Sequence, residues 1–187
     1  YSGSMPGTSA STETKLAAVI LAAGGSTRLG QPKQLLRYRG QALILRMARL
    51  ARRAVGGRVI VVLGDQQQRL RSLLRRHARN LPIVNNVSWQ KGLATSLQAG
   101  LKRVPPATNA VLVLLVDQAR LEASDISRLI SGWRKRPGKP AAAFYLGAAG
   151  APAVIPRSWF SEVFSLEGDA GARSLLRRLS DVSLIDM

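Results

Sequence analysis

Short apolar runs alternate along the chain with longer segments whose apolar positions recur with a helical period. The continuous runs are typical of strands buried on both faces of a sheet. The ranges predicted as strands are 15–23, 58–63, 81–84, 110–116, 140–146, 151–155 and 182–185. The ranges predicted as helices are 41–55, 66–78, 93–104, a helix with Ser124 as N-cap, 158–164 and 170–179. This alternation predicts an α/β fold, a single-domain Rossmann-like three-layer sandwich with a mostly parallel central sheet.

Three strand ends in this pattern carry residues suited to binding a ligand. The first strand runs into Gly24-Gly25, the second stops at Gly64, and the strand 110–116 ends at Asp117. Ligands of parallel sheets bind beyond the carboxyl ends of the strands. We therefore expect these three strand ends to line one crevice.

The glycine loop after the first strand has the composition of a phosphate-binding turn. Gly24 and Gly25 let backbone N–H groups converge on an anion, and Arg28 and Lys33 add positive charge. The Rossmann pattern G-x-G-x-x-G is absent. The Walker pattern also fails, because Gln31-Pro32 stands where Lys-Ser/Thr is required.

Two aspartates are candidate ligands of Mg²⁺. Asp117 follows the most apolar predicted strand, where a carboxylate would face the crevice and offer the hard oxygen that this cation prefers. Asp169 lies in Gly168-Asp169-Ala170-Gly171, where it could instead serve as the N-cap of the helix 170–179.

The strand followed by A-A-G-G-S-x-R-x-G-x-P-K, residues 22–33, resembles the signature of nucleotidyltransferases with a glycosyltransferase-A-like fold. Within that superfamily, Ala23 and the run Pro32-Lys33-Gln34-Leu35-Leu36 are most similar to the molybdenum cofactor cytidylyltransferases. The resemblance continues through the segments around Asn86 and Asp169. It departs from the family at Ala119, which replaces a usual proline, and at Ala151, which replaces a frequent histidine.

The resemblance implies roles for individual residues. The implied catalytic residues are Arg28, Lys33, Asp117 and Asp169, of which Asp117 and Asp169 hold the metal. The implied nucleotide-binding residues are Leu21, Ala22, Ala23, Gly24, Gly25, Arg28, Lys33, Asn86, Gly92 and Ser96. The implied acceptor-binding residues are Gly150, Pro152 and Arg173.

The implied reaction moves the CMP part of CTP, with Mg²⁺, to the phosphate of molybdenum-loaded molybdopterin and releases pyrophosphate. GTP is the alternative co-substrate, and a molybdoenzyme that receives the cofactor is an implied partner. Three other functions stay open. One is transfer to a different phosphate-bearing acceptor, and another is a nucleotide-binding or cofactor-delivery protein with low turnover. The third is a nucleic-acid binder driven by the net charge of +18, which ranks last because the sequence contains no recognised nucleic-acid-binding motif.

Composition limits the partners and the location. The chain of 187 residues has a net charge of +18 and no cysteine, which excludes disulfides and thiolate metal sites. Its arginines lie mainly on the polar faces of the predicted helices, which predicts a solvated basic surface. No apolar run reaches the length of about 18 residues that a membrane span needs, so we expect no membrane partner. The dispersed arginines and the lack of a recognised motif lead us to expect no nucleic-acid partner. The absence of cysteine is compatible with a reducing compartment, and we expect a cytoplasmic location. The basic positions are Arg46, Arg49, Arg52, Arg53, Arg69, Arg71, Arg75, Arg76 and Arg79.

The N-terminal 14 residues differ in composition from the rest. They are rich in Ser, Thr and Gly, and Tyr1 to Ser4 resemble a remnant of cloning in front of Met5. We expect residues 1–14 to be a disordered tail and residues 15–187 to form one nucleotidyltransferase domain.

Overall fold

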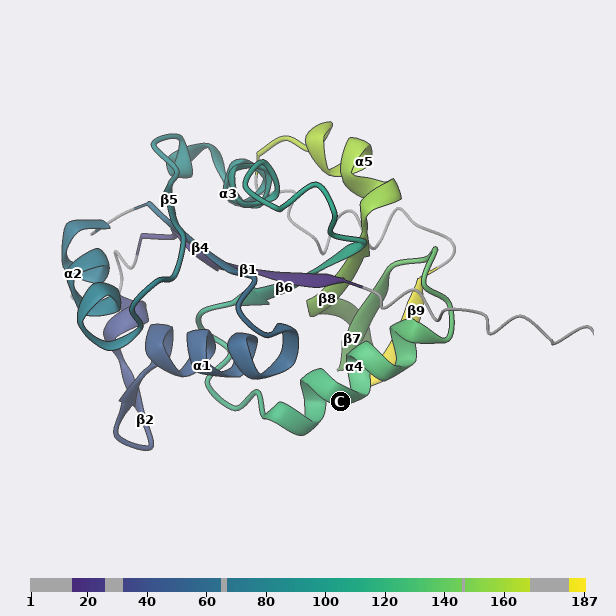
Figure 1. Cartoon of the computed structure of the whole chain (residues 1–187), viewed down its shortest axis with the longest axis horizontal. Coiled ribbons are helices and arrows are strands. Elements are labelled where there is room, and N and C mark those ends of the chain that lie inside the picture. The colour runs from purple at the N-terminus through teal and green to yellow at the C-terminus, as the bar shows by residue number, and fades with distance from the viewer. Residues whose placement is uncertain (1–14, 26–31, 65–66, 146, 169–181) are drawn as a thin grey trace, which may run out of the picture.

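A seven-stranded sheet separates two layers of helices (Figure 1). The computed structural model describes residues 15–25, 32–64, 67–145, 147–168 and 182–187. The strands of this sheet are β1 Leu16–Ala22, β4 Val59–Leu63, β5 Ile83–Asn85, β6 Ala110–Leu115, β7 Ala141–Tyr145, β8 Ala148–Pro156 and β9 Ser183–Asp186. The α-helices are α1 Leu43–Val55, α2 Gln67–His77, α3 Leu93–Leu101, α4 Ala123–Arg134 and α5 Phe160–Phe164. The predicted helix 170–179 and the predicted tail 1–14 lie outside the described residues.

The strand order is β5-β4-β1-β6-β8-β7-β9. β1 pairs in parallel with β4 and β6, and β4 pairs in parallel with β5. β8 runs antiparallel to both of its neighbours, β6 and β7, whereas β9 is parallel to β7. The mostly parallel sheet expected from the sequence is therefore confirmed.

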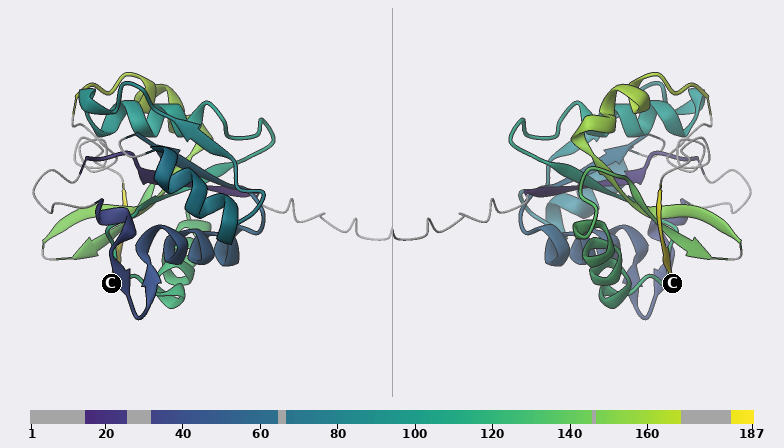
Figure 2. Two further views of the ribbon diagram at one scale, coloured as in Figure 1. Left: turned by 90° about the vertical axis from the view of Figure 1, so that its left-hand side faces the viewer. Right: turned by 90° about the vertical axis from the view of Figure 1, so that its right-hand side faces the viewer.

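Each face of the sheet has its own hydrophobic core because successive strand residues point to opposite faces. In β1, Ile20 and Ala22 join the core under α1, α2 and α4. Val19 and Leu21 join the core under α3 and α5. Figure 2 shows the two helix layers on opposite sides of the sheet. A strand that contributes to both cores must be apolar at every position. For this reason the continuous apolar runs in the sequence identified the strands.

The predicted helix 41–55 begins two residues late. Gln41 and Ala42 form β3 and pair with β2, Arg37–Tyr38, in a short antiparallel hairpin. The turn consists of Arg39 and Gly40, which have φ angles of 49° and 77°. Two successive positive φ angles suit the right-handed twist of a tight hairpin, so the backbone pairs here before the helix starts at Leu43.

The predicted strand 151–155 begins earlier in the structure and takes in most of the interval between the predicted strands 140–146 and 151–155. Ala148, Ala149 and Gly150 belong to β8, where they pair with Tyr145, Phe144 and Ala143 of β7. Small side chains have weak strand propensity, but pairing with the neighbouring strand outweighs that preference. β8 therefore starts three residues before the predicted position and carries the expected acceptor-side residues within a strand.

The order in which strands are added to the sheet reverses at β1. After β1 the chain builds outward through β4 and β5, and it then returns to place β6 on the other side of β1. Such a switch point opens a crevice between the loops that follow the two central strands. In this protein those loops are the glycine loop after β1 and the segment beginning at Asp117 after β6.

Candidate functional site at the ends of the central strands

Lys33 and Asp117 meet at the carboxyl ends of the central strands. Lys33 Nζ lies 2.9 Å from Asp117 Oδ2, although 84 positions separate the two residues in the sequence. The side chains are 33% and 45% exposed, so a ligand can reach both of them. A Cβ added at Gly24 would lie 4.0 Å from Lys33 Cε, which means that the lysine side chain passes beside the glycine loop. The predicted cation, carboxylate and glycine turn therefore occupy one site.

A short 3₁₀ turn, η1 Lys33–Leu35, places one side chain at the surface and the next one in the interior. Lys33 points to the crevice, whereas the Gln34 side chain is 1% exposed. Gln34 Nε2 donates to the carbonyl oxygens of Ala22 and Gly24, both at 2.9 Å. Gln34 thus ties the glycine loop to the turn that carries Lys33. Its own Oε1 is buried and has no hydrogen-bond partner among the described residues.

The wall on the β4 side is formed by a close backbone approach. A Cβ at Gly64 would stand 2.6 Å from the Ala23 carbonyl oxygen and 2.6 Å from Trp89 Cβ. Only a glycine fits between the glycine loop and the Trp89 side chain. The strand end at Gly64 therefore lies against the glycine loop, and Trp89 stands beside it.

Asn86 and Ser96 are joined to each other inside the protein. Asn86 Nδ2 donates to Ser96 Oγ and to Thr95 Oγ1, both at 2.9 Å, and Asn86 Oδ1 accepts from the Ser88 N–H at 3.0 Å. Both residues are buried. These bonds hold the segment between β5 and α3 in place, together with Thr95 Oγ1, which donates to the carbonyl oxygens of Ser88 and Gly92. Gly92 starts α3 with a φ of 106°.

The chain that leads to Asp169 is fastened to α3. The Ala94 N–H in the first turn of α3 donates to the Gly168 carbonyl oxygen at 3.2 Å. Gln98 Nε2 donates to three carbonyl oxygens, of Val163, Phe164 and Leu166. Gly168 therefore lies beside the start of α3. Arg28, Asp169 and Arg173 lie outside the described residues.

The predicted acceptor side is connected to the Asp117 segment through one carbonyl. The Ala151 oxygen accepts from Gln118 Nε2 at 2.7 Å and from the Tyr145 hydroxyl at 2.9 Å. Gln118 also accepts the Leu115 N–H through Oε1 at 3.2 Å. Gly150 and Pro152, the predicted acceptor residues, flank Ala151 and are buried, and the Ala151–Pro152 peptide bond is cis. A movement of β8 at Ala151 would therefore displace the side chain of Gln118, the residue next to Asp117.

Arg46 is a site-supporting residue that the sequence analysis placed on a solvated face. It is 6% exposed, and its guanidinium donates to the carbonyl oxygens of Ala119 and Leu121 and to Glu122 Oε1. Glu122 is the N-cap of α4, and its N–H donates to Asp125 Oδ2 at 2.9 Å. The predicted N-cap Ser124 is therefore wrong by two positions. Arg46 holds the loop that follows Asp117 against α1.

The described residues supply one carboxylate of the expected metal site. No three acidic or histidine side chains gather in the part of the chain that the structure describes. Asp117 fits a hard divalent cation in chemistry, because it is a carboxylate that is 45% exposed and lies 2.9 Å from Lys33, whose side chain passes beside Gly24. The expected second carboxylate, Asp169, follows Gly168, the residue bonded to α3.

Three residues with important contacts had no distinct signal in the sequence. Gln34, Arg46 and Gln118 each bind backbone carbonyls of another segment. A polar residue that satisfies distant carbonyls looks like any surface residue in a one-dimensional pattern. Gln34 could have been suspected only because it stands between Lys33 and the apolar pair Leu35-Leu36.

No helix among the described residues has the length and apolar character that spanning a bilayer requires.

Comparison with known proteins agrees with this geometry. The family model described as MobA-like NTP transferase domain matches residues 18–182. A Paenarthrobacter nicotinovorans protein named nicotine blue oxidoreductase is 37% identical over 171 residues, which cover 86% of this chain and 80% of that protein. An Opitutus terrae protein named probable molybdenum cofactor guanylyltransferase is 32% identical over 124 residues, which cover 66% of this chain and 58% of that protein.

The fold is similar to that of the Mycobacterium tuberculosis protein Rv0371c. Its crystal structure superposes with a TM-score of 0.78 at 28% identity and covers 93% of this chain and 88% of that chain. The same mycobacterial protein has been solved as a complex with manganese, which superposes with a TM-score of 0.75 at 26% identity and covers 93% of this chain and 89% of that chain.

Proposed function

The chain belongs to the MobA-like NTP transferase family, and we propose that it transfers the CMP part of CTP to the phosphate of a molybdenum-loaded molybdopterin. The observation that carries the proposal is the contact of 2.9 Å between Lys33 and Asp117 beside the glycine loop. That contact puts a cation for the triphosphate and a carboxylate for a divalent cation in one crevice. We further propose that residues 15–187 act as one nucleotidyltransferase domain, in the cytoplasm.

The glycine loop is the proposed cradle for the triphosphate. Gln34 engages the carbonyl oxygens of Ala22 and Gly24 from within the protein. The loop therefore directs these two carbonyl dipoles to a buried amide, which lowers repulsion of an anion at the outer side. N–H groups of the loop, Lys33 and Arg28 are the proposed donors to the phosphates.

Asp117 and Asp169 are the proposed ligands of Mg²⁺. A bound divalent cation neutralises charge on the triphosphate and the acceptor phosphate. Lys33 balances the charge of Asp117 in the present arrangement. We propose that the Lys33 ammonium is directed toward the phosphates once a nucleotide is bound, since it lies between the carboxylate and the glycine loop.

The proposed chemistry needs alignment more than proton transfer. An oxygen of the acceptor phosphate forms a bond to the α-phosphorus of CTP, and the bond between that phosphorus and the bridging oxygen of the β-phosphate breaks. Pyrophosphate leaves with the bonding electrons. The attacking oxygen is already anionic, so the chain has to hold two polyanions together and compensate their charge. Lys33 and Arg28 are the proposed groups for that task.

The proposed base site is the wall around Gly64 and Trp89. Asn86 and Ser96 are buried and bonded to each other. We therefore propose that they act by fixing the backbone from residue 86 to Gly92, and that this backbone reads the base edge. The preference for CTP rests on Ala23 and on the run that begins at Pro32, whereas a relative at 32% identity is named a guanylyltransferase.

The proposed acceptor site is the surface around Gly150 and Pro152, with Arg173 as a donor to the acceptor phosphate. The hydrogen bond of Gln118 to the Ala151 carbonyl supports this assignment, because it couples the acceptor strand to the Asp117 segment. A molybdoenzyme is the proposed recipient of the finished cofactor.

The experiment that tests the proposal measures pyrophosphate release with Mg²⁺ and each of CTP, GTP, ATP and UTP. Each reaction is run with and without molybdenum-loaded molybdopterin. Of the four nucleotides we expect only CTP to release pyrophosphate, and only in the reaction that contains the pterin. Pterin-dependent release with GTP would reject the base assignment but retain the acceptor. Release that does not depend on the pterin, or nucleotide binding without release, would reject the acceptor.

A redox reaction is the second candidate, because one relative at 37% identity is named an oxidoreductase. The sequence has no G-x-G-x-x-G pattern for a dinucleotide, so we rank this candidate second. Oxidation of NADH or NADPH in the presence of candidate acceptors, followed by absorbance, separates it from nucleotidyl transfer.

A further inference from the structure

The charges of this protein are unevenly distributed along the chain. Residues 15–116 contain 18 Lys and Arg residues but only one acidic residue, Asp65. The other nine acidic residues of the ten in the chain lie before or after this range. The helices α1 and α2, which both belong to this range, contain no acidic residue.

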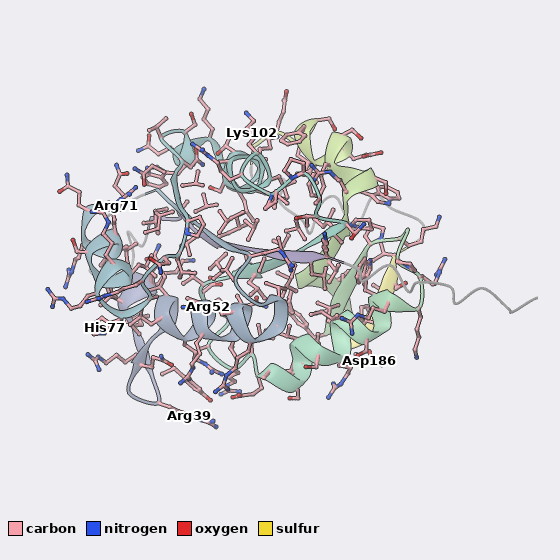
Figure 3. The ribbon with its side chains drawn as sticks, viewed as in Figure 1. Arg39, Arg52, Arg71, His77, Lys102 and Asp186 are labelled. Atoms are coloured by element: carbon pink, nitrogen blue, oxygen red, sulfur yellow. The ribbon has the colours of Figure 1, made fainter. Side chains whose placement is uncertain are left out.

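The basic side chains of α1 and α2 that reach solvent form one surface, here called the α1–α2 basic surface. It consists of Arg49, Arg52, Arg53, Arg69, Arg71, Arg75, Arg76 and His77, all exposed except Arg71, which is half-buried. In Figure 3, Arg71 and His77 lie along α2 at one end of the molecule, whereas Lys102 lies on the opposite helix layer. The ion pairs found between described residues involve Lys33, Arg39 and Arg46, and none involves this surface. Its positive charge is therefore not neutralised by carboxylates of the described chain.

Two grooves run along this surface. A groove of about 510 Å³ lies between α1 and the end of α2, with Arg49, Arg52, Arg53 and His77 on its walls. A second groove of about 390 Å³ has Arg37, Arg69 and Arg76 on its walls. Neither groove is lined by Lys33 or Asp117. The three arginines of the first groove all come from α1, whereas those of the second come from β2 and α2. Such rows of guanidinium groups suit an extended row of phosphates, to which each can donate two hydrogen bonds.

The make-up of the surface narrows the class of partner. The large hydrophobic side chains that the described residues expose are Val87, Tyr145, Phe164, Leu184 and Met187, and none belongs to α1 or α2. Protein interfaces need apolar anchors at their centre, so an acidic protein is disfavoured. Neither helix contains Phe, Tyr or Trp. A surface for single-stranded nucleic acid needs such rings for stacking on bases, so it too is disfavoured.

We propose that the α1–α2 basic surface binds the phosphate backbone of double-stranded nucleic acid without reading its sequence. The site is separate from the nucleotide crevice and does not depend on the transferase reaction. This proposal departs from the expectation of no nucleic-acid partner, because five of the arginines that seemed dispersed in the sequence line two grooves in the fold: Arg49, Arg52, Arg53, Arg69 and Arg76. Binding by charge alone releases counterions and therefore weakens steeply as salt increases.

The test measures the affinity of the full chain for a short fluorescent DNA duplex of mixed sequence by anisotropy, between about 50 and about 200 mM salt. Wild type should lose roughly 10³-fold in affinity across this range if it binds about six phosphates. The variant R49A/R52A/R53A should bind at least tenfold more weakly and show a salt slope shallower by about 0.9 for each phosphate that it no longer neutralises. The variant R49K/R52K/R53K keeps the charge and should remain close to wild type.

A variant with the same change in net charge serves as the control. K102A/R103A/R134A removes three exposed cations that line neither groove. It should bind the duplex within about twofold of wild type. Equal losses in the two alanine variants would overturn the proposal, because binding would then follow net charge alone. Equal or tighter binding of single-stranded DNA or of polyglutamate, or displacement of the duplex by CTP, would also overturn it. Thermal unfolding of each variant verifies that it is folded.

Discussion

Lys33 Nζ lies 2.9 Å from Asp117 Oδ2, at the point where the two central parallel strands end. The lysine arrives from a 3₁₀ turn after the glycine loop, and the aspartate arrives directly after β6. The contact can be a structural ion pair or part of a catalytic site, and variants separate these two roles. An exposed ion pair contributes about 0–1 kcal/mol to stability, whereas a charge that stabilises a transition state contributes more to the rate.

We therefore predict that Lys33→Ala and Asp117→Asn each lower turnover by about 10²-fold or more. The free energy of unfolding should change by less than about 1 kcal/mol, because both side chains are a third or more exposed. Turnover is measured as pyrophosphate release, and stability by urea denaturation. The swapped double variant K33D/D117K can restore the ion pair but not the positions of the charges. Recovery of turnover in that variant would show that the pair is only structural.

The second prediction concerns Gln34, whose side chain is buried and bonded to two carbonyl oxygens of the glycine loop. Gln34→Leu leaves both carbonyls without this partner, which should lower the free energy of unfolding by about 1–3 kcal/mol. The loop should also lose its fixed position, so the KM for the nucleotide should rise.

Gln34→Glu is the matched variant, because it keeps the shape but removes the Nε2 donor. It should raise the KM in the same way. An unchanged nucleotide KM in both variants would limit Gln34 to a role in stability.

The third prediction concerns Gly64, where a side chain would meet the Ala23 carbonyl oxygen and Trp89, both at 2.6 Å. Gly64→Ala should destabilise the protein by about 1–3 kcal/mol through overpacking and should weaken nucleotide binding by displacing the glycine loop. Gly57→Ala is the control, since a Cβ there would have no atom within 4 Å. Calorimetric titration with CTP and thermal unfolding give both quantities. A Gly64→Ala variant that behaves like Gly57→Ala would contradict the close approach.

The fourth prediction uses two arginines of α1. Arg46 is buried and bonded to the loop 119–122, whereas Arg49 is exposed. Arg46→Ala should lower the free energy of unfolding by about 2–3 kcal/mol, because hydrogen bonds of a charged group disappear and carbonyls are left unpaired. Arg49→Ala should stay within about 0.5 kcal/mol of wild type. Equal effects in urea denaturation would mean that Arg46 does not anchor this loop.

The fold and the centre of the site followed from the sequence because both depend on local patterns. Apolar runs marked the buried strands, and strand ends in a parallel sheet meet at one edge, so the glycine loop and Asp117 could be predicted to lie together. Lys33 was predicted to join them because it follows the glycine loop closely and adds positive charge to the same anion. In each case the deciding information lay within a few residues of the position concerned.

The supporting residues could not be predicted in this way. Arg46 bonds to carbonyls 73 and 75 positions away, and no periodic pattern distinguishes it from Arg49. Gly150 was expected between two strands, but pairing with Ala143 of β7 makes it part of a strand. Asn86 and Ser96 were predicted as nucleotide-binding residues, and nothing in their sequence indicated that each is buried and bonded to the other. Such partnerships depend on the tertiary structure.

The most direct test of the proposed transferase reaction is the identity of the product. The chain is incubated with Mg²⁺, CTP and molybdenum-loaded molybdopterin, and the pterin fraction is analysed by mass spectrometry, with Asp117→Asn as the matched control. We predict that wild type joins CMP to the pterin phosphate through a new phosphoanhydride bond, and that Asp117→Asn leaves the pterin unchanged. A pterin that stays unmodified with wild type, while CTP binds and the protein is folded, would contradict the proposed reaction.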